Sequence, residues 1–164
     1  MNNTKFEAEG SQLVVTRTFN ASVKLVWRAW TEPELLDQWW APSPWKSKTR
    51  SMDFKEGGNR LYAMCGPEGE EHWALTTYER IDNLVGFAGE DAFCDNHGVV
   101  NKDFPVAQFK NNSEEKSYTT IVKVVTQYAS KEHLQQVIDM GMKEGLSMAY
   151  ENLDNLIDQI KGQE

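Results

Sequence analysis

The chain has 164 residues, which is enough for one ordinary domain with its own core, without help from disulfides or a structural metal. Hydrophobic residues make up 40% and charged residues 26%, a balance that argues against intrinsic disorder. The formal net charge of −8 argues against nucleic acid as a partner, because an acidic protein repels phosphates. We expect a single domain over residues 1–164, with residues 1–11 as a flexible N-terminal segment.

No targeting or membrane-inserting segment is visible in the sequence. The N-terminus, MNNTKFEAEG, is polar and lacks the apolar stretch of a secretory signal. No run approaches the roughly 18 consecutive apolar residues that a membrane-spanning helix needs. Cys65 and Cys94 are too few for a disulfide framework and are expected to be reduced and free. Together these features predict a cytoplasmic protein without membrane insertion.

The first 45 residues predict one strand and two short helices. Residues 12–20 alternate apolar and polar side chains, which is typical of a strand. Ser22 is a candidate N-cap for a helix with apolar residues at helical spacing, namely Val23, Val26, Trp27 and Trp30. Residues 31–34, Thr-Glu-Pro-Glu, form a capping-box pattern that opens a second helix, and Pro42 ends it.

From residue 46 to residue 127 the hydrophobic period is two, which indicates consecutive strands. We expect them at about 46–54, 59–65, 71–81, 84–93, 104–110 and 117–127. The separating segments are rich in Gly, Asn and Asp, and 111–113 is one of them. Such short connections predict an antiparallel meander.

The remainder predicts one long helix that starts at the N-cap Ser130 and carries an apolar stripe to the C-terminus. Thirty helical residues span about 45 Å, so the stripe is buried only if the helix lies across a curved sheet. The predicted fold class is α+β: a seven-stranded curved antiparallel sheet around a long C-terminal helix, with two short helices after the first strand. This geometry usually leaves an apolar cavity between helix and sheet.

Several segments resemble a known family. Residues 15–19, 26–34 and 38–42 resemble the opening of the activator of heat-shock-protein-90 ATPase homologue-like family, and 64–69, 78–81 and 145–153 match in register. The resemblance covers about residues 12–160. It implies the START/Bet v 1-like (SRPBCC) superfamily, the helix-grip fold and an internal pocket. It implies no single activity, since members include carriers of apolar ligands and cyclases. Ala41 departs from the glycine usual at that position, and residues 89–105 match no known site.

Five residues are candidates for lining such a pocket because of their size or adaptability. Gly141 and Gly145 share one face of the predicted helix, where each costs about 1 kcal/mol relative to alanine. Either the sheet approaches the helix closely there or the missing side chains leave room for a ligand. The nearby Met142 could adapt to varied apolar shapes. Trp40 is either pocket lining or plain core, and the same alternatives hold for Trp73.

Two charged residues are further candidates. Arg17 is in phase with the apolar residues of its strand, so it is predicted to point inward, where it needs a carboxylate. Glu79, in phase with Leu75 and Ile81, is the expected partner. Such a pair could orient the polar end of a ligand or transfer a proton, or it could be a structural ion pair at the sheet edge.

The sequence predicts no catalytic nucleophile, metal or cofactor. Ser147 lies in a Gly-Leu-Ser-Met-Ala segment, but a nucleophile elbow needs a strand-to-helix turn and this segment is predicted to be helical. Cys94 and His97 have a spacing compatible with metal binding, yet Cys65 and His72 do not form a second such motif.

These observations favour binding of a small, largely apolar molecule in the cavity, by a protein that is not an enzyme. Two alternatives stay open. One is a cyclase- or hydrolase-type enzyme that acts on a hydrophobic substrate through Arg17, Glu79 or His72. The other is a protein-interaction or chaperone-cofactor-like module, which an exposed apolar patch would favour.

Overall fold

The computed structural model of the protein describes residues 4–161. Within them the chain forms eight strands and four helices. In chain order they are β1 (Lys5–Glu9), β2 (Gln12–Phe19), α1 (Val23–Thr31), α2 (Pro33–Leu36), β3 (Lys46–Met52), β4 (Asn59–Cys65), β5 (Glu71–Asp82), β6 (Gly86–Cys94), β7 (Ala107–Lys116), β8 (Thr119–Gln127), α3 (Lys131–Asp139) and α4 (Met142–Lys161).

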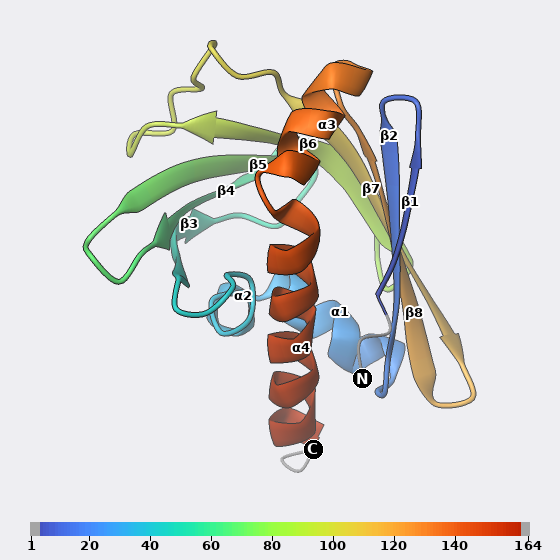
Figure 1. The fold of residues 1–164 in the computed structure, drawn as a ribbon. Helices are drawn as coiled ribbons and strands as arrows, with labels where there is room; N and C mark the ends of the chain where they lie inside the picture. The colour runs from blue at the N-terminus through green and yellow to red at the C-terminus, as the bar shows by residue number, and fades with distance from the viewer. Residues whose placement is uncertain (1–3, 162–164) are drawn as a thin grey trace.

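The strands form one antiparallel sheet in the order β1-β2-β8-β7-β6-β5-β4-β3. The sheet is strongly curved, and α4 runs across its concave face (Figure 1). The helices α1 and α2 close one end of this arrangement, and α3 lies at the other end (Figure 1). The predicted α+β helix-grip architecture is therefore confirmed, with eight strands in place of seven. None of the helices within residues 4–161 is both long and apolar enough to cross a membrane.

The extra strand corrects the expectation of a flexible segment over residues 1–11. Residues 5–9 pair along their whole length with β2 through a tight turn in which Gly10 has a φ of +61°. Phe6 packs against the core, and Thr4 accepts a hydrogen bond from Arg17. Backbone pairing thus orders a segment whose polar side chains suggested a loop, whereas residues 1–3 lie outside the described part.

The helix starts follow the predicted caps in two of three cases. The side chain of Ser22 accepts a hydrogen bond from the Leu25 amide at the start of α1, and Ser130 does the same for His133 at the start of α3. The capping box at 31–34 is wrong, because α1 continues through Thr31 and α2 begins after Glu32 without a side-chain cap. The Thr31 hydroxyl donates to the Trp27 carbonyl instead.

The predicted turn at residues 111–113 is also wrong. Strand β7 continues to Lys116, and the reversal occurs at Ser117 and Tyr118, whose φ angles are +51° and +67°. Two successive positive φ values are characteristic of tight hairpin turns. Asn111 is consequently a strand residue, 2% exposed, on the inner face of the sheet.

The expected long helix is divided in two. α3 ends at Asp139, and Gly141 adopts a φ of +91° before α4 begins. This conformation is accessible to glycine and strained for other residues. Gly141 is therefore a helix break, while Gly145 lies inside α4.

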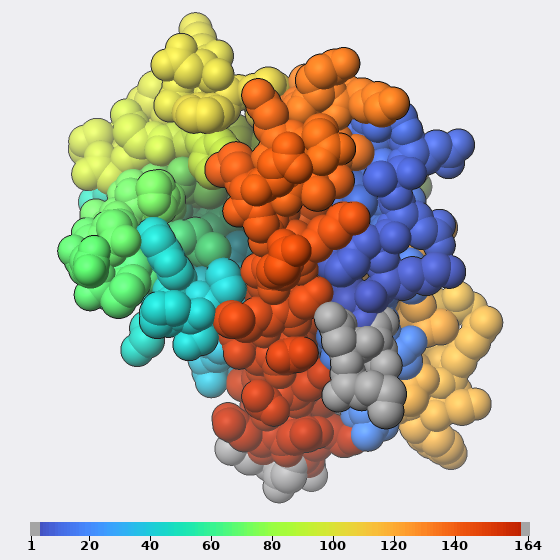
Figure 2. Space-filling model, in the orientation of Figure 1, coloured from blue at the N-terminus to red at the C-terminus, as the bar shows by residue number. Residues whose placement is uncertain are grey.

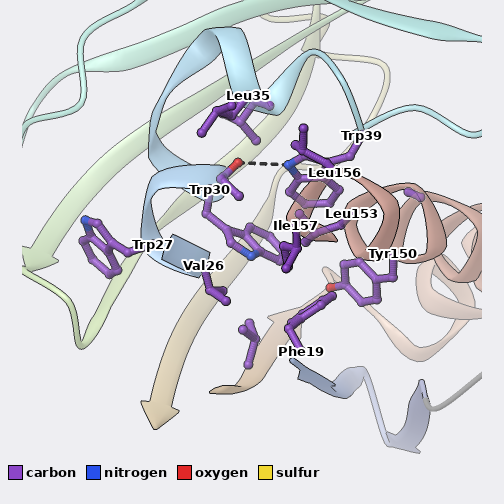
Figure 3. Packing of buried hydrophobic residues seen from close by; sticks show 14 of the residues in the cluster. Phe19, Val26, Trp27, Trp30, Leu35, Trp39, Tyr150, Leu153, Leu156 and Ile157 are labelled. Atoms are coloured by element: carbon purple, nitrogen blue, oxygen red, sulfur yellow. Dashed lines mark hydrogen bonds between the residues drawn. The ribbon is translucent and has the colours of Figure 1, made fainter. Parts of the chain in front are cut away.

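The packed part of the core joins α1, α2 and the C-terminal half of α4. Trp30, Trp39 and Tyr150 contact one another edge to face or tilted, with Leu153 and Ile157 beside them (Figure 3). The Trp39 indole N–H donates to the Ala29 carbonyl at 2.9 Å, which satisfies the polar atom of this buried ring. These contacts anchor the end of the molecule opposite α3.

Candidate functional site

A cavity of about 480 Å³ lies between the concave face of the sheet and the segment formed by α3 and the N-terminal half of α4. Its wall is mostly aromatic and aliphatic. In Figure 2 the surface is recessed between the orange-red helix and the green strands. Phe93 and Met140 line the cavity and are 51% and 81% exposed, so they mark its opening.

Four of the predicted pocket residues line this cavity: Trp40, Gly141, Met142 and Gly145. A Cβ atom at Gly145 would lie 3.6 Å from Pro42 Cγ, an ordinary van der Waals contact. The sheet therefore does not approach the helix closely at Gly145. Of the two explanations for that glycine, the geometry favours the one in which the missing side chain leaves space.

Two other predicted residues lie away from the cavity. Trp73 points to the outer face of the sheet, where the Arg50 guanidinium lies 5.7 Å from its ring centroid. Glu79 is exposed at an irregularity of β5 between Tyr78 and Arg80, where the register with β6 shifts. Thr76 and Tyr78 face the cavity, so Leu75 and Glu79, which have the opposite phase, face outward, and the β-bulge after Tyr78 returns Ile81 to the core side.

Arg17 points inward as predicted, but its partner is Asp154 and not Glu79. The side chain of Arg17 is 2% exposed, forms an ion pair with Asp154 on α4 and donates to Thr4 Oγ1 at 3.1 Å. Burial raises the pKa of Asp154, although the Arg17 charge acts in the opposite direction. The pair links β2 to α4 beside the packed core and does not line the cavity.

A second buried arginine, which sequence reasoning missed, does line the cavity. Arg60 donates from Nη2 to Ser47 Oγ at 2.9 Å and from Nε to Thr49 Oγ1 at 3.0 Å. Its charge is paired with Asp37, which follows α2, at 3.4 Å. The guanidinium also lies 3.9 Å from the ring centroid of Tyr62. Arg60 is therefore held by neighbouring groups, and its alternation with Tyr62 and Met64 was the available signal.

Asp91 is the second functional candidate that sequence reasoning missed. It lies on the inner face of β6, in phase with Phe87 and Phe93, and it lines the cavity. Thr76 Oγ1 donates to its carboxylate at 2.6 Å, and within residues 4–161 no ion pair involves it. Burial raises the pKa of Asp91 to about 6, against the opposing effects of Thr76 and Arg60.

Asp91 lies inside the molecule, but part of its carboxyl group stays accessible. The side chain is surrounded by protein, yet it is only half-buried because the cavity lies beside it. A ligand in the cavity can therefore reach the carboxylate. The signal in the sequence was an acidic residue in phase with two phenylalanines.

The hydroxyl groups near this wall stay neutral. Burial raises the pKa of Tyr62 to about 12 and moves those of Tyr78 and Tyr150 further above the usual range. These tyrosines can offer hydrogen bonds to a bound molecule but no charge.

The cysteines and histidines considered from the sequence as metal ligands are not brought together within residues 4–161. Cys65 and Cys94 are free and lie on β4 and β6, with β5 between them. Burial raises the pKa of Cys94, which keeps its thiol protonated. His72 lies against Trp45, with ring centroids 5.4 Å apart. Across the described part of the chain, no three His, Cys, Asp or Glu side chains are arranged to hold a metal ion.

A family model for activator of Hsp90 ATPase homolog 1-like proteins matches residues 20–158. The chain belongs to this family. The sequence resemblance to activator of Hsp90 ATPase homolog 1-like proteins is thereby confirmed over most of the chain.

Solved structures from bacteria share the fold of this family member. A protein from Arthrobacter aurescens is 26% identical, with a TM-score of 0.87 over 94% of this chain and 91% of its own. Protein Ms6760 from Mycobacterium smegmatis is 32% identical, with a TM-score of 0.84 over 94% of each chain. A search of curated proteins gives no match.

Proposed function

We propose that this protein binds a small, largely apolar molecule in the cavity between the sheet and α4. The observation that carries the proposal is the cavity itself: its volume of about 480 Å³ is within the range of roughly 300–1,000 Å³ typical of ligand pockets. Such pockets combine an apolar wall with a few polar groups, and Asp91 and Arg60 are polar groups of this wall.

The residues of α4 that face the cavity support the same proposal. Gly145 and Ala149 carry little or no side chain where the helix spans the hollow. Larger apolar residues there would fill the space and add stability, since protein interiors are normally close-packed. Small residues that keep a hollow open are expected where a ligand occupies it.

The geometry gives less support to the enzyme alternative in the form that the sequence suggested. Arg17 is paired with Asp154, whereas Glu79 and His72 are exposed. These three side chains do not converge on one site. The exposed apolar side chains Phe93 and Met140, which a protein-interaction module could use, belong to the opening of the cavity.

Two measurements test the proposal. Native mass spectrometry of protein purified without denaturation should show a co-purified small molecule, and an environment-sensitive naphthalene dye should bind the folded protein at one molecule per chain. Gly145→Leu, which places a large side chain in the cavity, should weaken dye binding strongly. Glu144→Leu is the matched control, because it adds the same side chain at the neighbouring exposed position of α4.

Dye binding that appears only under partly denaturing conditions would contradict the proposal. Equal effects of Gly145→Leu and Glu144→Leu would also contradict it, since they would place the dye outside the cavity.

A further inference from the structure

We propose that the cavity is selective for small organic cations, in which an apolar body fills the hollow and a protonated amine contacts the carboxylate of Asp91. This inference rests on the proposed function and names the chemical class of its ligand. It follows from the contrast between the two charged groups of the cavity wall.

The first step is the lack of a cationic partner for Asp91. Its one hydrogen bond, among the described residues, comes from Thr76 at 2.6 Å. A carboxylate offers about four acceptor positions, so most of its capacity is unused. A buried carboxylate without a counter-charge is unfavourable, and a ligand cation would compensate it.

The second step is that the charge of Arg60, unlike that of Asp91, is already paired within the protein. Its Nη2 and Nε groups donate to Ser47 and Thr49, and its charge is paired with Asp37. The ring of Tyr62 covers one face of its guanidinium. The charge on the cavity wall that has no counter-ion within residues 4–161 is therefore the negative charge of Asp91.

The third step is the aromatic character of the wall next to Asp91. Phe87 and Phe93 lie on the same face of β6, while Tyr78 and Phe109 flank Gly89 from the neighbouring strands. Aromatic rings attract organic cations through their negative faces, and this attraction grows in a desolvated site. A carboxylate among aromatic rings is the combination that recognises a hydrophobic amine.

The charge state of Asp91 adds a pH dependence to this selectivity. Arg60 is the charged group whose field acts on Asp91, and the tyrosines that interact with it, Tyr62, Tyr78 and Tyr128, have raised pKa values and stay neutral. Since the pKa of Asp91 is about 6, the carboxylate is charged at neutral pH. It loses its charge, and its attraction for an amine, as the pH falls below that value.

Calorimetric titrations with three matched naphthalene probes test the inference on the full chain. The probes are 1-naphthylmethylamine, the neutral 1-naphthylmethanol and the anionic 1-naphthoate. At pH 7.5 the amine should bind about tenfold or more tightly than the alcohol, as expected for a buried charge-assisted contact. The naphthoate should bind more weakly than either.

Asp91→Asn should remove the preference for the amine over the alcohol. Glu90→Gln is the control, because it removes the same charge from the adjacent residue, which points to the opposite face of the sheet. A pH series on the unmodified protein needs no variant: the amine affinity should fall toward that of the alcohol as the pH drops below the pKa of Asp91, whereas the alcohol affinity changes little.

Equal binding of amine and alcohol would overturn the inference and leave the proposed function standing. The same holds if Asp91→Asn keeps the amine preference or if the naphthoate binds most tightly. If none of the three probes binds, the proposed function fails, and the inference fails with it.

Discussion

The two halves of α4 place the same residue type in opposite surroundings. Leu146 and Leu153 are seven residues apart, so they project from nearly the same face of the helix. Leu153 has no exposed surface and packs among aromatic rings in the solid part of the core (Figure 3). Leu146 is half-buried and lines the cavity. One helix thus provides both the packing that holds the fold together and one wall of the cavity.

The charged residues near the two halves of α4 also differ, because in the described part of the chain one has a counter-ion and the other does not. Beside the packed core, Arg17 has Asp154 as its counter-ion. At the cavity, Asp91 has the Thr76 hydroxyl as its one partner among residues 4–161. The packed half pairs its buried charge within the protein, while the hollow half places a carboxylate without an ion-pair partner among the described residues beside an open space. The tight packing and the proposed binding cavity therefore lie at separate ends of one sheet.

The largest expected effect contrasts the two leucines. Leu153→Ala should lower the free energy of unfolding by about 2–5 kcal/mol, since it opens a void in a packed region. Leu146→Ala should lower it by less than about 1 kcal/mol, because Leu146 already borders a hollow. Urea denaturation measures both values. Similar losses at the two positions would show that the halves are equally packed.

A second prediction concerns the effect of Asp91 on stability at different pH values. The pKa of Asp91 is raised from 3.8 to about 6, so the folded state binds its proton more tightly than the unfolded state does. Stability from this group is present below about pH 4 and is lost as the pH rises through 6, by up to about 3 kcal/mol. Asp91→Asn should therefore be more stable than the unmodified protein at pH 7.5.

The stability advantage of Asp91→Asn over the unmodified protein should disappear near pH 4, where residue 91 is neutral in both folded proteins. Chemical denaturation of the two proteins across this range measures the difference. A constant difference at all pH values would show that Asp91 does not titrate as described.

The adjacent tryptophans give a third contrast of intermediate size. Trp39→Phe should cost about 1–3 kcal/mol, because it removes ring volume from the packed region and leaves the Ala29 carbonyl without its indole donor. Trp40→Phe should cost less, since Trp40 borders the cavity. Trp40→Phe should instead reduce the change in fluorescence on dye binding, an effect that the outer-face control Trp73→Phe should not show.

The smallest effects, of opposite sign, are expected at the two glycines. Gly145→Ala should raise the free energy of unfolding by up to about 1 kcal/mol, because alanine favours a helix and its Cβ meets only Pro42 at an ordinary distance. Gly141→Ala should lower it by about 1 kcal/mol, since a φ of +91° is strained for alanine. Thermal unfolding of both variants decides the signs, and destabilisation at Gly145 would contradict an open space beside it.

The sequence predicted the elements that depend on local pattern and cap chemistry. The alternation of β2 and β4 and the caps at Ser22 and Ser130 are properties of neighbouring residues, and the structure confirms them. Strand β1 was missed because its order comes from pairing with β2 and carries little hydrophobic signal of its own. The predicted turn at residues 111–113 was wrong because Asn111 lies in a strand and faces the cavity, which no local sequence pattern reveals.

The candidate site was predictable only in its helical part. Trp40, Met142 and the two glycines stood out by residue type and spacing. Asp91 and Arg60 did not, since a charged residue on a strand usually points to solvent, and the cavity that makes them important comes from distant strands. The Arg17–Asp154 pair joins residues 137 positions apart, so only the tertiary structure could reveal the partner.

The two outer strands of the described sheet also influence how copies of this chain meet one another. β3 presents exposed Lys46, Lys48 and Arg50 and contains a bulge between Thr49 and Ser51. β1 is five residues long and exposes Lys5 and Glu7. Like charges, bulges and short length all oppose the addition of a further strand from another molecule. Edge-to-edge polymerisation is therefore disfavoured at both borders, even in a protein whose interior is partly unfilled.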